Sequence, residues 1–463
     1  MRSVRSVLRP LAFAVLVAAA CGPSAGVKRA QTLLDRGDYK AAADAADQEL
    51  GKTPNDGQLI RIRIRAALGM GDARDAVGRY RTYRAGRPDE DLAALRTMAM
   101  TTLWQGLTSP SAQVQVQAIQ AIERLEIEAF AHDVGDRMGD DDDAVVAAAS
   151  IAILRAFPQA PDVATEMLKS EDPRARAIAV EGIGRKVGKH AAEDLRFAAV
   201  DPDPRVRAAA VFAIAALADP ADTERLSELT GDRSAEVRNA ALRALSRGKR
   251  GDLGAVAERA LADESLGVRL AAVDLLVASR GRPAARPLLT HADAMLAAYA
   301  ARALKDPQAG AAAVDRALAD ADWTIRAGAV NLLEAALGKE GARPRAEKAT
   351  SDPTVAVQIS AARLLAYMGD RERAIAVYAA ALSSAEVDDR VGAAAELAHL
   401  GDARGAATLE ELAATTEPGV RRAVITAHRA ARVITPGLWG ALADEDASNR
   451  IEAAAALYEL GAR

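Results

Sequence analysis

The sequence predicts an all-α protein built from helical repeats, and three observations support this prediction. Hydrophobic residues make up 50% of the 463 residues but aromatic residues only 3%, so the chain lacks the side chains that usually cover β-sheets. Ala, the best helix former, is abundant. The spacing of Gly, Ala, apolar and Asp residues also repeats, first with a period of about 34 residues and then of about 31.

Charge and cysteine content exclude several classes of protein. The 60 basic and 64 acidic residues give a net charge of −4, so no nucleic-acid partner is expected. The single cysteine, Cys21, excludes an intrachain disulfide framework and a cysteine-cluster metal site. Neither a Walker-type phosphate loop nor a serine nucleophile motif is present. The sequence therefore predicts no catalytic residue, no metal site and no cofactor.

Residues 1–20 are predicted to be an export signal. Three arginines precede a short apolar run that ends at Ala20, and this run has too few residues to cross a bilayer. The small residues before Cys21 resemble the end of a bacterial lipoprotein signal, in which the cysteine receives lipid and becomes the mature N-terminus. Ala18 stands where that family usually has Leu, and it also fits an ordinary secretory cleavage site that would leave Cys21 as a free thiol. The resemblance implies a lipid-anchored protein of the bacterial cell envelope, on the periplasmic face of the outer membrane, with 21–26 as a short linker.

Residues 27–105 contain the first repeats. Four pairs of residues recur at an offset of 34: Gly37 and Gly71, Asp38 and Asp72, Ala42 and Ala76, Pro54 and Pro88. This pattern resembles the tetratricopeptide repeat, a helix–turn–helix unit, although its early large residues are absent. Each Gly is expected to follow the first helix in a left-handed conformation, and each Ala is expected at the close helix crossing. Residues 91–105 are expected to form a further helix that covers the second of these repeats.

Residues 106–463 contain about twelve copies of the second repeat. Each copy has an anchor residue, in most copies apolar, at Val114, Val145, Ala175, Val206, Val237, Val268, Leu296, Ile325, Val357, Asp389, Val420 and Asn449. Ala follows the anchor by four places in eleven copies, and Ile or Leu follows it by eight places in eleven, which places all three residues on one stripe of a helix. Asp precedes the anchor by five places in seven copies, where a turn or helix cap is expected. Each copy therefore predicts a helix, an acidic turn and a second helix.

These copies resemble HEAT repeats, in the short bacterial form first named from phycocyanobilin lyases. The resemblance implies a right-handed α-α superhelix in which the second helices line the concave side. We expect this array to extend outward from the membrane as an elastic arm. No residues that would hold a tetrapyrrole are evident, so no lyase chemistry is transferred.

An Arg follows the anchor directly in eight copies. One interpretation is an anion-binding row; the preferred one pairs each Arg with a turn Asp of its own or a neighbouring repeat. The residues expected to form this structural ladder include Asp201, Arg207, Asp232, Arg238, Asp263, Arg269, Asp320 and Arg326.

Basic residues gather in the links that follow several second helices. They are Arg185, Lys186, Lys189, Arg247, Lys249, Arg250, Arg280, Arg282, Arg286, Lys339, Arg343, Arg345 and Lys348. In a solenoid these links share one edge, and cations are favoured at helix C-termini. The edge is either a docking strip for an acidic partner, such as anionic lipid head groups or an envelope polymer, or simply a solvated surface.

Three further sets of residues have a structural and a functional interpretation. The acidic run 140–143 is interpreted as a turn with helix-capping acids and not as a calcium loop. His428 and His399 are interpreted as a packing irregularity and not as a metal pair. Trp104, Trp323 and Trp439 are expected to fill gaps in the core and not to line a site.

The sequence thus favours a lipid-anchored envelope scaffold that binds one or more envelope proteins without catalysis. Binding is expected on the concave surface or along the charged edge. Two alternatives stay open: a lyase-type enzyme or cofactor-handling protein, and a polyanion or anionic-lipid binder that uses the basic edge.

Overall fold

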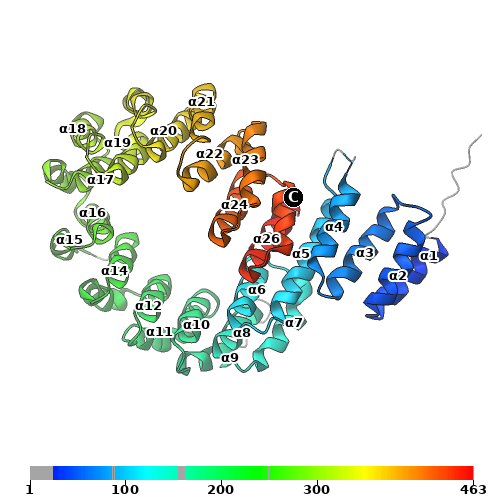
Figure 1. Cartoon of the computed structure of the whole chain (residues 1–463). Coiled ribbons are helices and arrows are strands. Elements are labelled where there is room, and N and C mark those ends of the chain that lie inside the picture. Colours follow the sequence, from blue (N-terminus) through cyan, green and yellow to red (C-terminus); the bar gives the residue numbers. More distant parts are fainter. Residues whose placement is uncertain (1–23, 86, 88, 155–161, 249–250, 462–463) are drawn as a thin grey trace, which may run out of the picture. The chain divides into compact units, whose positions relative to one another are not determined.

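Every regular element that the computed structural model describes is a helix (Figure 1). The described residues are 24–85, 87, 89–154, 162–248 and 251–461. The predicted all-α solenoid is therefore confirmed. The chain forms two compact units, Met1–Ala85 and Gly86–Arg463. The export signal, Cys21, Pro88, Lys249 and Arg250 lie outside the described residues. None of the helices in the described ranges combines the length and apolar character that a bilayer crossing requires.

The first unit consists of two helical hairpins. Its helices are α1 (Ala25–Asp35), α2 (Tyr39–Leu50), α3 (Gly57–Gly69) and α4 (Ala73–Arg84). Gly37 and Gly71 follow α1 and α3 with φ angles of 77° and 79°, the left-handed region in which Gly avoids the steric cost of a side chain. The aspartate after each glycine caps the next helix through its carboxylate. Ala42 and Ala76 are completely buried between the helices, as the 34-residue spacing predicts.

A buried arginine links the helices of this unit. Arg63 on α3 lies between Asp47 on α2 and Asp75 on α4, with N–O distances of 2.9 Å and 2.7 Å. Arg79 on α4 also bonds to Asp47, at 3.0 Å. The four residues join three helices with compensated charge. The repeat pattern gave no indication of this cluster.

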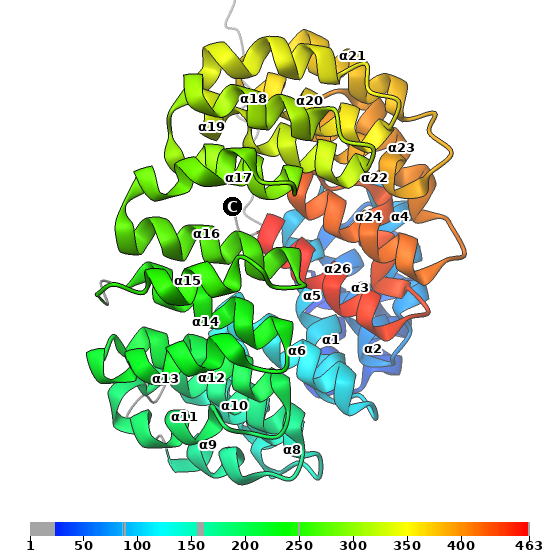
Figure 2. The ribbon, with the colours of Figure 1, turned by 90° about the vertical axis from the view of Figure 1, so that its left-hand side faces the viewer.

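The second helices of the repeats follow one another through the whole second unit. They are α6 (Ala112–Arg124), α8 (Asp143–Leu154), α10 (Pro173–Lys186), α12 (Pro204–Leu217), α14 (Ala235–Arg247), α16 (Leu266–Arg280), α17 (Ala294–Leu304), α19 (Trp323–Ala349), α20 (Val355–Tyr367), α22 (Val387–His399), α24 (Pro418–Ala431) and α26 (Ala447–Gly461). Figure 2 shows α12, α14, α16 and α17 stacked one above another. The Ala four places after the anchor is completely buried in all eleven copies that have it, so neighbouring helices approach closely at that position.

The first helices are shorter and less regular. The α-helical ones are α5 (Leu92–Leu107), α7 (Ala131–Asp136), α9 (Asp162–Glu166), α11 (Ala192–Ala198), α13 (Thr223–Glu228), α15 (Gly254–Ala260), α18 (Pro307–Leu318), α21 (Arg371–Ala381), α23 (Ala403–Ala413) and α25 (Pro436–Gly440). Short 3-10 segments extend or replace them at η1 (Glu128–Phe130), η2 (Arg137–Gly139), η3 (Met167–Lys169), η4 (Gly188–Ala191), η5 (Pro220–Asp222), η6 (Leu229–Gly231), η7 (Arg282–Thr290) and η8 (Ala441–Ala443). Gly338 interrupts α19 with a φ angle of 68°, so α19 contains the second helix of one repeat and the first helix of the next.

The core of this unit runs along the array in unequal blocks. One continuous cluster of buried apolar residues extends from Ile151 to Leu276. Beyond it the core consists of smaller clusters, such as those spanning 359–397 and 391–427. The core between α8 and α16 therefore extends over more repeats than the clusters that follow it.

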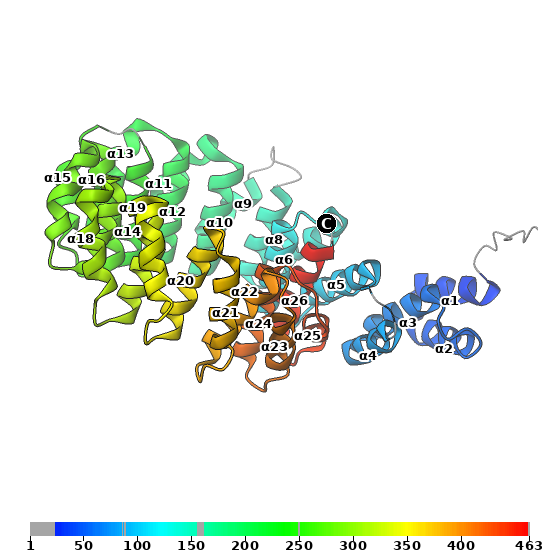
Figure 3. The same cartoon turned by 90° about the horizontal axis from the view of Figure 1, so that it is seen from above.

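The array closes on itself. The last helix, α26, packs antiparallel against α5 and also contacts α6 (Figures 1 and 3). Arg96 on α5 donates a hydrogen bond of 2.9 Å to the Tyr458 hydroxyl, and its guanidinium stacks 4.7 Å from the centre of that ring. A Cβ atom on Gly106 would lie 2.4 Å from Cδ1 of Ile451. The expectation of an extended elastic arm is therefore wrong, because the two ends of the array bury each other.

Helix α5 begins this array. The sequence interpretation placed residues 91–105 with the tetratricopeptide-like repeats, as a covering helix. The structure includes α5 in the unit that begins at Gly86, where it packs against α6 and α26. It is the first helix of the repeat whose second helix is α6, so the division lies after Ala85 and not after Gln105.

Candidate functional site

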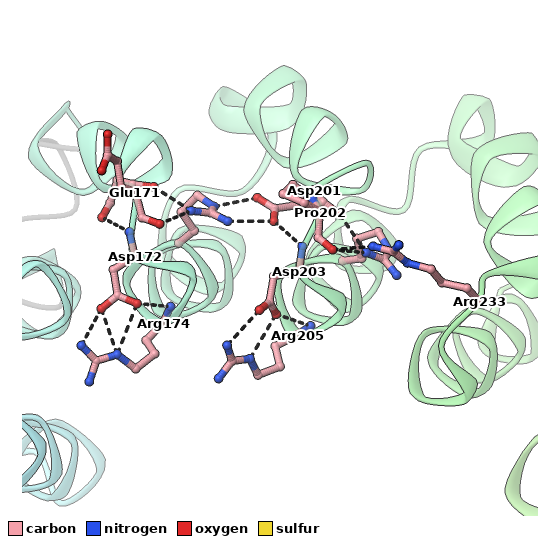
Figure 4. Close-up of polar contacts among 11 residues, drawn as sticks. Glu171, Asp172, Arg174, Asp201, Pro202, Asp203, Arg205 and Arg233 are labelled. Carbon is pink, nitrogen blue, oxygen red and sulfur yellow. Dashed lines mark hydrogen bonds and ion pairs between the residues drawn. The ribbon is translucent and has the colours of Figure 1, made fainter.

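An arginine–aspartate ladder joins successive repeats of the second unit. Arg207 on α12 donates from Nε and Nη2 to both carboxylate oxygens of Asp232, at 2.7 Å and 2.8 Å. Its Nη1 donates to the backbone carbonyls of Asp201 and Pro202, at 2.8 Å and 3.0 Å. Asp201 in turn accepts from the arginine of the preceding repeat, and Figure 4 shows this series of contacts. Arg207 thus fixes the turn before its own helix and the turn of the next repeat.

The ladder is incomplete. Its ion pairs are Arg176–Asp201, Arg207–Asp232, Arg238–Asp263, Arg269–Asp293, Arg326–Asp352 and Arg421–Asp444. In every pair the aspartate belongs to the following repeat. Asp320 has no such arginine, because Ala297 occupies the position after the preceding anchor. Among the residues that the structure describes, Arg390 and Arg450 donate only to carbonyls of their own repeats.

Five of the ladder carboxylates have lowered pKa values, which favour the charged form: Asp232, Asp263, Asp293, Asp352 and Asp444. Burial alone would raise the pKa of Asp232, but hydrogen bonds from Arg207 and from the Ser234 N–H outweigh burial and lower that pKa. Asp203 is more exposed, and hydrogen bonds from Arg205 lower its pKa to about 2. These aspartates and arginines are therefore engaged with each other, which favours the structural interpretation of the ladder over an anion-binding row.

Most of the predicted basic edge is neutralised by nearby acids. Arg185 and Lys186 approach Glu123 at 3.7 Å and 3.9 Å. The remaining ion pairs of this edge are Arg280 with Asp252 and Glu258, Arg286 with Asp306, Arg343 with Asp370, and Arg345 with Asp315. Lys339 lies over the ring of Tyr367, and Lys189 and Lys348 are within electrostatic range of Asp219 and Asp315. Among the described edge residues, Lys189, Lys339, Lys348, Arg247 and Arg282 make no ion pair, and only Arg247 and Arg282 have none of these weaker contacts either. A continuous strip of free positive charge is therefore not present in the described part of the edge.

The acidic run has the geometry of a capped turn. Asp142 accepts hydrogen bonds from the Ala144 and Val145 N–H groups, at 2.9 Å and 3.3 Å, and Asp140 accepts from the Asp142 N–H at 3.1 Å. These bonds start α8. Within the described ranges, no group of three His, Cys, Asp or Glu side chains is arranged to hold a metal ion.

The histidines and tryptophans have different environments. His428 is completely buried, with Nδ1 2.8 Å from the Val424 carbonyl and Nε2 2.7 Å from the Thr435 hydroxyl, whereas His399 is exposed at the end of α22. Trp439 fills the core as expected. Trp104 and Trp323 are 40% and 47% exposed, so the expectation that they fill gaps is wrong.

The open surface of the second helices is the largest feature that the ladder leaves free. Helix α12 is covered by α10 on one side, α14 on the other and α11 behind, and Figure 1 shows the second helices on the inside of the circle. Its exposed residues, Arg205, Phe212 and Ala216, therefore face inward. We call these positions, and the corresponding positions of the other second helices, the inner face.

The inner face has an irregular set of side chains. Six places after the anchor, successive helices from α10 to α17 present Glu181, Phe212, Arg243, Asp274 and Arg302. Asp274 is compensated, because it accepts from Arg302 at 2.6 Å and from the Tyr299 hydroxyl at 2.7 Å. Burial, together with this hydrogen bond, raises the pKa of Tyr299 to about 12. Phe212 and Tyr367 are exposed on this face at 49% and 69%, which the repeat pattern did not predict.

Comparison with known proteins supports the repeat type. A family model described as HEAT repeats matches residues 160–246, from the repeat of α10 to that of α14. The repeats are similar to HEAT repeats. The X-ray structure of YibA from Escherichia coli is 18% identical, covers 54% of this chain and 98% of its own, and has a TM-score of 0.40. The crystal structure of an engineered protein is also 18% identical, with coverages of 78% and 98% and a TM-score of 0.25. No curated protein matches the chain.

Proposed function

We propose that the protein is a lipid-anchored interaction scaffold of a bacterial cell envelope. It binds one or more envelope proteins through the inner face of its HEAT-like array and performs no catalysis. The lipid is attached to Cys21. The first unit lies next to the membrane because only residues 21–26 separate that cysteine from the first repeat.

The observation that carries this proposal is the difference between the ladder and the inner face. The polar residues that recur along the array bond to each other between repeats, as Arg207 and Asp232 do. The inner face instead exposes residues that differ from one repeat to the next, including Phe212 and Tyr367. Aromatic and arginine side chains dominate the binding energy of protein interfaces. A preformed helical surface also needs little ordering when an extended partner binds.

The test is cross-linking mass spectrometry on native envelopes, with the wild-type protein beside Cys21→Ser. We expect cross-links from the second unit to one or two envelope proteins, and fewer of them in the variant because it is no longer held at the membrane. Metabolic labelling with a fatty-acid analogue gives a separate measure of lipid attachment, which Cys21→Ser should abolish. Absence of any protein partner in both samples would refute the scaffold. Equal labelling of the wild type and the Cys21→Ser variant would refute lipid attachment at Cys21 but not the scaffold.

A further inference from the structure

One part of the inner face combines an exposed aromatic ring with uncompensated positive charge. Phe212 on α12 is 49% exposed. On the adjacent helix α14, Arg243 and Arg247 are exposed one helical turn apart. Neither guanidinium makes a hydrogen bond or an ion pair with the described residues, whereas the neighbouring Arg205 and Arg302 are each bonded to an aspartate. We call Phe212, Arg243 and Arg247 the α12–α14 patch.

The acids around the patch do not neutralise it. Asp274, on the next helix, is already bonded to Arg302 and Tyr299. Glu236 lies at the start of α14, two turns before Arg243, and Glu181 lies on α10, beyond Phe212. Two guanidinium groups therefore face the inside of the circle beside an apolar ring, and their charge is available to a partner.

We propose that the α12–α14 patch binds an extended acidic segment of a partner protein. This inference rests on the proposed scaffold function and names the chemistry of its partner. A carboxylate of the segment pairs with Arg243 and Arg247, because guanidinium groups bind carboxylates with two parallel hydrogen bonds. An apolar side chain of the same segment covers Phe212.

The spacing of the helices sets the order of residues in the segment. Neighbouring helices pack about 8–10 Å apart, and an extended chain advances about 3.3 Å per residue. A segment that crosses from α12 to α14 therefore places its apolar residue about three positions before its acidic residues. The concave position of the patch favours a narrow extended chain, because a flat bilayer cannot reach an inward-facing surface.

Fluorescence anisotropy with synthetic peptides tests the proposal on the full-length protein. The probe is a labelled peptide with a Leu three positions before a Glu-Glu pair, and the matched control peptide has Lys-Lys in place of Glu-Glu. We expect Arg243→Glu with Arg247→Glu to weaken binding of the probe by roughly a hundredfold, and Phe212→Ala by roughly tenfold. Binding should also weaken as salt is added, because the contacts are charged.

Matched variants on the first helices serve as controls. Arg259→Glu with Arg282→Glu makes the same change of net charge at exposed arginines on α15 and η7 that form no ion pair with any described residue, and Phe197→Ala removes a ring that is 80% exposed on α11. Both should leave the affinity within a factor of about two. The proposal is overturned if the wild-type protein does not bind the probe, if it binds the Lys-Lys peptide equally well, or if the control variants weaken binding as much as the patch variants. Envelope cross-links at other surfaces would then leave the scaffold standing, whereas absence of cross-links would remove the scaffold itself.

Discussion

Arg207 and Asp232 form a bidentate ion pair that is almost completely buried, with side chains 6% and 9% exposed. The pair joins one repeat to the next, and the same arginine also binds two backbone carbonyls of its own turn. Two residues earlier on the same helix, Arg205 makes a similar contact with Asp203, but its side chain is 56% exposed and its partner lies in its own turn. Variants of the two arginines therefore measure how much burial and linkage between repeats together contribute to the free energy of unfolding.

Arg207→Ala should destabilise the protein by about 3 kcal/mol, because it leaves a buried carboxylate and two carbonyls without their donor. Arg205→Ala should cost less than about 1 kcal/mol, since exposed ion pairs contribute little. Urea unfolding of both variants measures the difference. Equal losses for the two variants would contradict the structural role assigned to the ladder.

Thr415→Asp should add a missing rung to the ladder. Arg390 already donates through Nη1 to the carbonyls of Ser384 and Ala385, as Arg207 does in its own repeat, but Thr415 occupies the position of the next aspartate. The Thr415 hydroxyl accepts from the Glu417 N–H, a bond that Asp would keep. We expect a gain of roughly 1 kcal/mol in unfolding free energy. Thr415→Asn, which lacks the charge, is the control and should gain less.

Gly106→Ala should weaken the closure of the array. The added Cβ would lie 2.4 Å from Cδ1 of Ile451 and 2.8 Å from the Cβ of Ala118, so the Ile451 side chain must change conformation and α5 must separate from α6 and α26. We expect a loss of about 1–3 kcal/mol and a larger radius of gyration by small-angle X-ray scattering. Gly392→Ala is the matched control, because nothing lies within 4 Å of its new Cβ; it should stabilise α22 by about 0.5–1 kcal/mol. An unchanged radius for Gly106→Ala would mean that the closure tolerates the added atom.

Stability should fall with pH below the ordinary range of histidine because of His428. Burial lowers the pKa of His428 below 6.5, so the unfolded chain takes up this proton first as the pH falls. The contribution of neutral His428 to the free energy of unfolding is complete above about pH 6.5. Below that pH it is lost, with a slope of up to about 1.4 kcal/mol per pH unit. The ladder aspartates with lowered pKa values, such as Asp232 and Asp263, lose their contribution to stability only as the pH falls below about 4.

Denaturant unfolding across this pH range separates the two effects. The double variant His428→Leu with Thr435→Val removes the buried imidazole together with its hydroxyl partner, and it should show no loss between pH 6.5 and the aspartate range. His399→Leu, at an exposed position, should behave as the wild type does. A wild-type profile that is flat below pH 6.5 would contradict the assignment to His428. Glu410 is the carboxylate that acts on this imidazole, so Glu410→Gln checks whether its charge alters the profile.

The repeats and their internal contacts were predictable because they are local in sequence. The spacing of anchor, Ala and Asp residues follows from helix geometry and turn chemistry, so Arg207 and Asp232 stood out as a recurring pair. The closure was not predictable, because the contact between Gly106 and Ile451 depends on the curvature accumulated over all intervening repeats. The inner face was missed for a related reason. Whether Phe212 is buried or exposed depends on which sides of α12 its neighbours cover, and the sequence pattern alone does not show this.

The contact between α5 and α26 restricts the number of repeats that the array can contain. In an open solenoid a repeat is gained or lost at little cost, because each repeat contacts only its neighbours. Here one additional or missing repeat would separate the two helices that meet. A Cβ on Gly461 would lie 3.8 Å from the Leu92 carbonyl oxygen, so the end of the last helix adjoins the start of the first. Circular permutation of the second unit without residues 1–85, with these two helix ends joined and new termini cut in a distant turn, should therefore be tolerated where duplication of a repeat is not.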